Sequence, residues 1–130
     1  MILVDTHVVV WLAFDPGRLS NKARAAIDSA RAQGEGLAIC DISLLELATL
    51  VSKGRVRLAI GLESFLREVE ARFVVVPITS RACATALGLP AAYPSDPADR
   101  IIGATAVVEG IPLLTADREI RRSKAVQTIW

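Results

Sequence analysis

Four acidic residues stand at positions that suit a shared chemical site. Asp5 comes directly after a short apolar run, Asp117 follows Leu113-Leu114-Thr115-Ala116 at the end of another, and Glu46 and Asp99 each lie in the first turn of a segment with helical character. If the apolar runs are parallel strands, their carboxyl ends meet at one edge of the sheet, where ligands bind in such folds. The sequence therefore predicts that the four carboxylates gather at that edge.

Carboxylates at close quarters repel one another, and their pKa values rise unless a cation compensates the charge. Hard oxygen ligands suit Mg²⁺ or Mn²⁺, and the single imidazole of the chain, on His7, argues against zinc. In nuclease sites such ions stabilise both the attacking water and the leaving oxygen of a phosphodiester. We therefore predict that Asp5, Glu46, Asp99 and Asp117 are the metal ligands and catalytic residues of a phosphodiesterase.

Each of these acids also has an explanation in helix capping. The segment Ser43 to Glu46 fits a capping box, and Asp96 to Asp99 reads as a cap, a first-turn proline and a carboxylate that favours the helix dipole. Asp5 and Asp117 each precede a segment that they would cap. Capping alone, however, has no reason to coincide with the carboxyl end of every strand, so the joint placement favours a shared site.

The elements that must position these residues follow from the apolar pattern. Five runs rich in Val, Ile and Leu predict strands buried on both faces. They are Ile2 to Val4, Leu37 to Cys40, Phe73 to Val76, Pro112 to Leu114 and Ala125 to Ile129. Helices are predicted at Ser20 to Gln33, Ser43 to Ser52, Glu63 to Arg72, Ser80 to Leu87 and Asp96 to Glu109. This alternation implies an α/β fold, with a parallel sheet of four to five strands between two layers of helices.

Composition sets further bounds. With 52% hydrophobic and 22% charged residues the chain is expected to fold, and no linker divides it, so we expect one domain over residues 1–130. The 15 basic residues nearly balance the 14 acidic ones, so any contact with nucleic acid must be local. Cys40 and Cys83 lie in apolar stretches and are expected to be core thiols. No targeting segment or apolar stretch of ~20 residues stands out, which predicts a cytoplasmic protein.

Four motifs give the whole chain a resemblance to the PIN-domain ribonucleases, and most closely to the VapC-like toxins of bacterial toxin–antitoxin pairs. The opening segment Met1 to His7, with Trp11-Leu12 behind it, looks like the first strand and first metal-binding Asp of that family. Ile42 to Leu47 and the downstream Lys53 to Val56 are similar to the segment that bears its Glu. Asp96 to Ala106 is the most specific match, and Leu113 to Asp117 resembles the last acidic motif.

The resemblance implies an α/β/α sandwich, a homodimer, cleavage of RNA, and inhibition by a cognate antitoxin whose tail covers the active site. It also implies that Asp5, Glu46 and Asp99 are the core metal ligands, with Asp117 acting directly or through water. One departure is Gly103, where Ala is expected more often, at a cost of up to ~1 kcal/mol in helix propensity.

Several neighbours of the acids are candidates for supporting roles. Thr6, Ser43, Asp96 and Thr115 are expected to orient carboxylates or metal-bound water, although capping explains Ser43 and Asp96 equally well. Basic residues near the acidic edge, foremost Arg100 and Arg118, would meet RNA phosphates, with a solvated helix face as the alternative for most of them; the others are Arg121, Arg122 and Lys124. His7 is interpreted as structural. Apolar residues beyond what one helix face buries predict an antitoxin or dimer surface, with core packing as the alternative; they include Trp11, Leu12, Phe14, Leu44, Leu45 and Leu47.

Two other classes of protein are alternatives. A phosphoacceptor receiver domain has a similar sheet and a Mg²⁺-binding acidic pocket, but it needs an acceptor Asp after the central strand. Taking Phe73 to Val76 as that strand, we find Pro77-Ile78-Thr79 behind it and no carboxylate. A non-catalytic PIN-like module that binds RNA or protein is the other alternative, and the presence of all four acids speaks against it.

Overall fold

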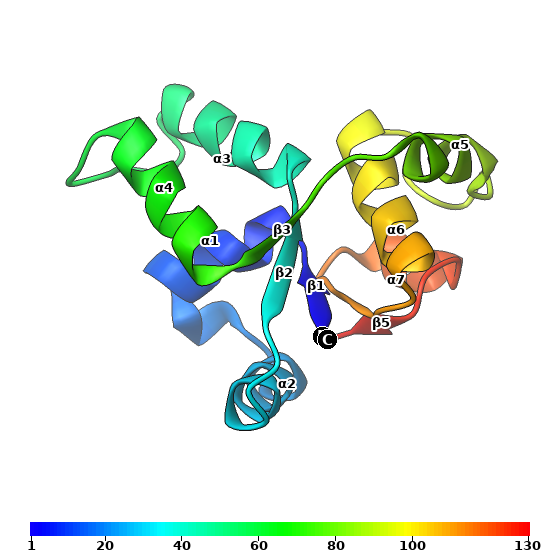
Figure 1. The fold of residues 1–130 in the computed structure, drawn as a ribbon, viewed down its shortest axis with the longest axis horizontal. Helices are drawn as coiled ribbons and strands as arrows, with labels where there is room; N and C mark the ends of the chain where they lie inside the picture. Colours follow the sequence, from blue (N-terminus) through cyan, green and yellow to red (C-terminus); the bar gives the residue numbers. More distant parts are fainter.

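The computed structural model describes residues 1–130 as a parallel five-stranded sheet with helices on both faces (Figure 1). The strand order is β3-β2-β1-β4-β5, and every neighbouring pair is parallel. The strands are β1 (Ile2–Val4), β2 (Leu37–Cys40), β3 (Val74–Val76), β4 (Leu113–Leu114) and β5 (Thr128–Ile129). The predicted α/β class and parallel sheet are thereby confirmed.

The helices that precede β3 in the chain cover one face of the sheet, and those that follow β3 lie on the other side. The first face carries α1 (Thr6–Phe14), α2 (Asn21–Ala32), α3 (Ile42–Ser52) and α4 (Leu62–Arg72), with the 3₁₀ turn η1 (Pro16–Arg18) between the first two. The other face carries α6 (Pro97–Glu109) and α7 (Arg118–Ser123), and α5 (Ser80–Gly88) packs against α6. None of the helices combines the length and apolar character that crossing a membrane requires.

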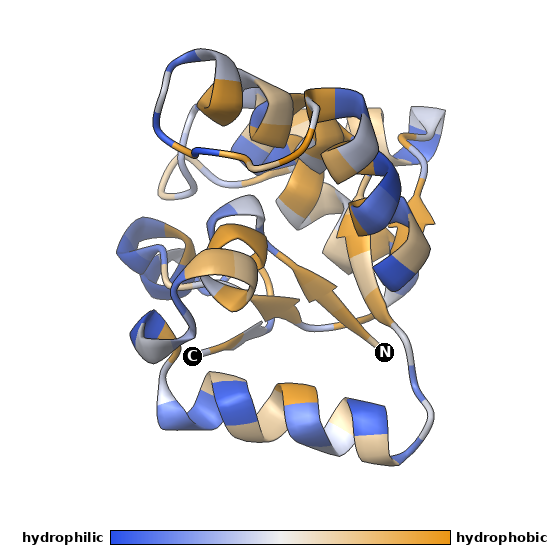
Figure 2. Ribbon diagram, turned by 90° about the vertical axis from the view of Figure 1, so that its left-hand side faces the viewer, coloured by the Kyte–Doolittle hydropathy of each residue, from blue (hydrophilic) through white to orange (hydrophobic).

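The sheet separates two apolar cores, because successive side chains of a strand point to opposite faces. Along β1, Ile2 and Val4 join the core beneath α1 to α4, while Leu3 joins the core beneath α6 and α7. Leu113 and Leu114 divide in the same way on β4. Figure 2 shows the strands as an apolar centre and α2, at the bottom, with many hydrophilic residues.

The outer strands and one cysteine differ from expectation. Strands β3 and β5 lie at the two edges of the sheet and are only partly buried, so the prediction of burial on both faces is wrong for them. The centre of the sheet is β1, not Phe73 to Val76. Cys40 on β2 is fully buried, but Cys83 is exposed, because α5 lies on α6 with one side facing solvent.

Candidate active site

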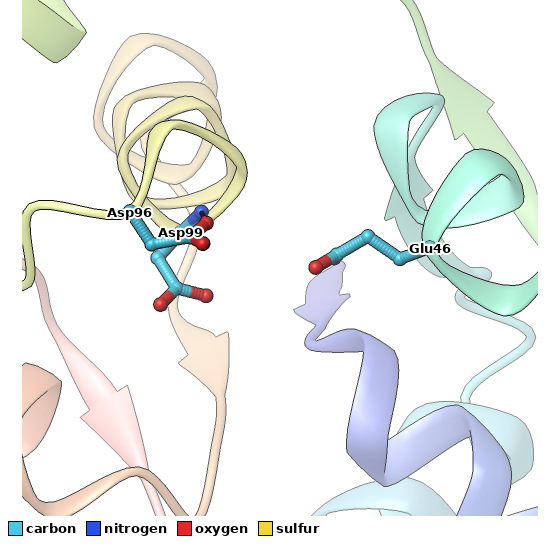
Figure 3. A group of neighbouring side chains, drawn as sticks. All are labelled: Glu46, Asp96 and Asp99. Atoms are coloured by element: carbon cyan, nitrogen blue, oxygen red, sulfur yellow. Dashed lines mark hydrogen bonds between the residues drawn. The ribbon is translucent and has the colours of Figure 1, made fainter. Parts of the chain in front are cut away.

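The predicted acids lie at the carboxyl edge of the sheet. Asp5 joins the end of β1 to α1, Asp117 joins β4 to α7, and Glu46 belongs to the helix that follows β2. Asp96 and Asp99 lie at the start of α6. Figure 3 shows Glu46 reaching from α3 toward Asp96 and Asp99 on the facing helix.

The tightest group of carboxylates contains one residue that was expected only to support the site. Ligand oxygens of Glu46, Asp96 and Asp99 all lie within 4.8 Å of one another. Asp5 and Asp117 fall outside this group, although the charges of both raise the pKa of Asp99. The structure therefore adds Asp96 to the set of direct candidates for a metal ion, beside the four that the sequence indicates.

The electrostatics of this group show an uncompensated negative charge. Burial is the largest cause that raises the pKa of Asp99, and the nearby charges of Asp5, Asp96, Glu46 and Asp117 add to it, so that the pKa reaches about 7. Burial likewise raises the pKa of Glu46, against a lowering hydrogen bond from Thr6. A divalent cation would relieve both effects, and an all-carboxylate set of hard oxygens fits Mg²⁺ or Mn²⁺.

Asp5 is held on both of its carboxylate oxygens. It is 4% exposed; its Oδ1 accepts the backbone N–H of Thr6 at 2.8 Å, which confirms the capping of α1. Its Oδ2 accepts the hydroxyl of Thr115 at 2.7 Å, and Thr115 in turn accepts the backbone N–H of Asp117 at 3.1 Å. Thr115 thereby ties two of the predicted ligands together across neighbouring strands.

The capping box expected at Ser43 to Glu46 is wrong. Helix α3 begins at Ile42, which places Glu46 beyond the first turn. The Thr6 hydroxyl instead lies 2.6 Å from Glu46 Oε1 and 2.9 Å from Ser43 Oγ. Since Thr6 has a single hydroxyl proton, it donates to the carboxylate, and Ser43 can donate to the Thr6 oxygen. The pair orients Glu46 toward α6 in place of capping α3.

The other caps are real and coexist with the site. Asp96 Oδ1 accepts the backbone N–H of Asp99 at 3.1 Å, and Asp117 Oδ1 accepts that of Ile120 at 3.0 Å. Each cap fixes the direction of a carboxylate relative to its helix. Asp5 and Asp117 cap helices that begin just after β1 and β4, so capping and the site coincide there. Helix α6 instead follows α5, and the loop between them brings Asp96 to the site.

Tyr93 is a supporting residue that the sequence analysis missed. Its side chain is 1% exposed and its hydroxyl donates to the backbone carbonyl of Asp99 at 2.8 Å. A Cβ at Gly103 would touch the Tyr93 hydroxyl and come within 2.6 Å of Cζ, so only glycine leaves room for the ring. The unusual glycine at position 103 was the one feature of the sequence that could have indicated this role of Tyr93.

The guanidinium of Arg100, a predicted RNA contact, makes hydrogen bonds within the fold. It donates to the backbone carbonyls of four residues that lead from α5 to α6, at 3.1–3.3 Å; they are Ala86, Leu89, Pro90 and Tyr93. These bonds fix the segment that ends at Asp96. Arg100 is therefore part of the frame that holds the acidic start of α6.

His7 has a structural place, as interpreted from the sequence. Its Nε2 accepts the backbone N–H of Ala116 at 3.0 Å, and its Nδ1 faces Asp5 Oδ2 at 3.6 Å. Its ring meets Trp11 edge to face at 4.9 Å. The hydrogen bond at Nε2 links α1 to the loop that carries Asp117.

Two hollows lie on the surface. A cleft of about 360 Å³ contains the carboxylates of Asp5, Glu46 and Asp99 and continues along an apolar wall of α3. A larger groove of about 630 Å³ lies away from the carboxylates, between α1, α4 and the start of β2. Eleven of its sixteen lining residues are hydrophobic, and Phe14 and Ile60 are exposed there.

Comparisons with known proteins extend over nearly the whole chain. The sequence profile of the PIN domain matches residues 2–125. Ribonuclease VapC22 of Mycobacterium tuberculosis is 41% identical over 131 residues, which cover 99% of this chain and 98% of that protein.

Solved structures share the fold at lower identity. The chain superimposes with a TM-score of 0.75 on VapBC2 from Rickettsia felis bound to a promoter DNA fragment, at 19% identity over 98% of this chain and 97% of that chain. A toxin–antitoxin complex from Klebsiella pneumoniae gives a TM-score of 0.68 at 23% identity, over 97% of this chain and 95% of that chain.

Proposed function

Because the chain belongs to the PIN-domain family and is a ribonuclease toxin of the VapC type, we propose that its carboxylate cleft hydrolyses internal phosphodiester bonds of RNA. The observation that carries the proposal is the approach of Glu46, Asp96 and Asp99 to within 4.8 Å beside the buried Asp5. We further propose that residues 1–130 form one PIN domain that acts in the cytoplasm. Through RNA cleavage it would inhibit translation or growth.

We propose Mg²⁺ or Mn²⁺ as the cofactor, held by Asp5, Glu46 and Asp99, with Asp96 beside them and Asp117 acting directly or through water. When bound, such an ion lowers the pKa of a water and stabilises the leaving oxygen of the phosphodiester. The protein's part is positioning: hydroxyls of Thr6 and Thr115 fix the carboxylates before substrate arrives. Their directions then need not reorganise during the reaction.

The positive charge of helix α7 suits a binding site for the RNA backbone. It follows Asp117 directly, and its exposed cations carry no ion pair; they are Arg118, Arg121, Arg122 and, just after the helix, Lys124. Glu119 is the one acid among them. Since the whole chain has a net charge of only +1, this is a local concentration of positive charge beside the site. We propose that Arg118 and its neighbours bind phosphates that flank the bond to be cut.

A cognate antitoxin is the proposed protein partner. A solved structure with this fold, from Klebsiella pneumoniae, is a toxin–antitoxin complex. The groove between α1 and α4 is apolar and rimmed by Arg31, Arg72, Glu35 and Glu68, which suits an amphipathic segment of that partner. A homodimer, as in the resemblance, is proposed for the free toxin.

Total bacterial RNA, incubated with antitoxin-free protein in Mg²⁺ or Mn²⁺, tests the function. The expected result is discrete cleavage, mapped by sequencing of fragment ends and lost both in EDTA and in Asp99→Asn. Asp28→Asn, an exposed acid on α2, serves as the matched control and should cleave normally. Full activity of Asp99→Asn, or cleavage that survives EDTA, would contradict the proposal.

The same assay separates the alternative. A non-catalytic module would bind RNA and leave it intact, with binding indifferent to Asp99→Asn. Membership of the PIN family decides against a receiver domain. The residues after Phe73 to Val76 do not decide against it, since the central strand is β1, which is followed by an acid, Asp5.

A further inference from the structure

The carboxylate cleft is only partly acidic, and its remainder has a distinct chemistry. Beyond Asp5, Glu46 and Asp99 it is lined by apolar side chains of Ile42, Leu45, Leu50 and Ala98 and by three polar ones, those of Thr6, His7 and Thr49. Leu45 is 63% exposed although it adjoins Glu46 on α3, whereas Leu47 on the same helix is buried. An exposed leucine in a cleft beside catalytic carboxylates is placed to touch a ligand.

The polar groups of this wall are already used within the fold. The Thr6 hydroxyl donates to Glu46, and the Thr49 hydroxyl donates to the backbone carbonyl of Leu45 at 2.8 Å. His7 accepts from Ala116 on one nitrogen and faces Asp5 with the other. Its side chain is 33% exposed, so it offers ring surface to a ligand, with Nδ1 turned toward Asp5. The wall therefore contacts a ligand mainly by its apolar and aromatic surface, and neither threonine hydroxyl proton is left free to donate to a ligand.

We propose that the wall of Leu45, Ile42, Leu50 and the His7 ring is a subsite for one unpaired nucleobase of the RNA next to the scissile phosphate. The inference rests on the proposed ribonuclease function. A nucleotide carries its phosphate and base on one sugar, so a phosphate at the carboxylates leaves the base to occupy the rest of the same cleft. The polar ribose fits an apolar wall poorly, whereas the face of a base stacks on apolar and aromatic groups.

The subsite has a consequence for specificity. Because the wall offers mainly apolar and aromatic surface, discrimination at this nucleotide follows stacking area, with purines preferred to pyrimidines.

The test compares Leu45→Ala with Leu87→Ala, a control of the same type on α5 that is 88% exposed and outside the cleft. A single-stranded RNA library of random sequence, cut in Mg²⁺ or Mn²⁺ and sequenced, gives the base preference at each position around the cut. An oligonucleotide chosen from it is then made with one abasic nucleotide at successive positions. Leu45→Ala should raise KM about tenfold on the intact oligonucleotide and have a much smaller effect on one abasic variant. Leu87→Ala should change neither value.

The outcomes separate the subsite from the function on which it rests. Cleavage by the wild type with a KM that Leu45→Ala leaves unchanged, or changes equally on every abasic oligonucleotide, overturns the subsite alone. A shift of the oligomeric state by Leu45→Ala in light scattering, with an equal KM change on all substrates, identifies Leu45 as a protein interface and also overturns it. Absence of metal-dependent cleavage by the wild type overturns the function and the subsite together.

Discussion

Replacing Asp99 by Asn is expected to stabilise the metal-free protein while it abolishes activity. Burial and the surrounding acids raise the pKa of Asp99 from 3.8 to about 7, so its ionised form destabilises the fold. Its side-chain carboxylate accepts no hydrogen bond from the protein, whereas its backbone N–H and carbonyl remain bonded in the variant. Asn keeps the shape of the side chain and removes the repelled charge.

The size of the effect follows from the two pKa values. A difference of about three pH units, at 1.36 kcal/mol per unit, sets an upper bound of about 4 kcal/mol, which screening by solvent in the open cleft reduces to about 1–2 kcal/mol. Loss of a first-turn carboxylate opposes this by about 0.3–1 kcal/mol. We expect Asp99→Asn to be more stable than the wild type by about 1 kcal/mol at pH 8 in EDTA.

The sign of the pH dependence is fixed by linkage. Because the folded pKa lies above the unfolded one, the folded state binds the proton more tightly, and this contribution to stability is lost as pH rises from about 4 to about 7. The advantage of Asp99→Asn should therefore largely disappear at pH 5, where Asp99 of the wild-type fold is protonated. Near-saturating Mg²⁺ should reverse the order at pH 8, since ligand at 100 times its Kd stabilises the wild type by ≈ 2.7 kcal/mol.

Urea denaturation followed by circular dichroism measures these differences, with Asp28→Asn as a control that should show no comparable change. Lower stability of Asp99→Asn than of the wild type at pH 8 in EDTA would refute the reasoning, because the ionised carboxylate would then be stabilising. An advantage of equal size at pH 5 and pH 8 would show that the effect does not come from ionisation.

Three further predictions concern the frame of the site and its charge. Thr115→Val should lower the free energy of unfolding, measured by urea denaturation, by about 1–3 kcal/mol, because it deprives the buried Asp5 of a hydrogen bond. It should also weaken Mn²⁺ binding in a titration, and an unchanged metal affinity would show that Thr115 does not position the site. Gly103→Ala should lower the free energy of unfolding by about 1–3 kcal/mol, because the new methyl group collides with Tyr93. Helix propensity alone predicts stabilisation by up to ~1 kcal/mol, and that result would show that the ring moves aside freely. Arg118→Ala should reduce the salt dependence of RNA binding by about one unit of log–log slope in fluorescence anisotropy, and an unchanged slope would place the RNA backbone elsewhere.

The order of the strands and the exposure of Cys83 could be learned only from the folded structure. Periodicity places β1 and β2 correctly, but it does not distinguish an edge strand from a central one, because both read as short runs of Val and Ile. The error over Phe73 to Val76 has this origin. Cys83 was misassigned for a related reason: an apolar stretch in a helix that packs on another helix has one side in solvent.

The sequence by itself determined the α/β class and pointed to four acids at one edge of the sheet. Both inferences rest on local patterns, because the periodicity and capping signals come from residues that are neighbours in the chain. Tertiary structure decided which carboxylates approach most closely, and it brought in Asp96. It also showed that Arg100 donates hydrogen bonds to backbone carbonyls and that the Thr6 hydroxyl donates to Glu46. These roles depend on contacts between residues far apart in the chain, and their directions and distances are set only when helices pack on both faces of the sheet.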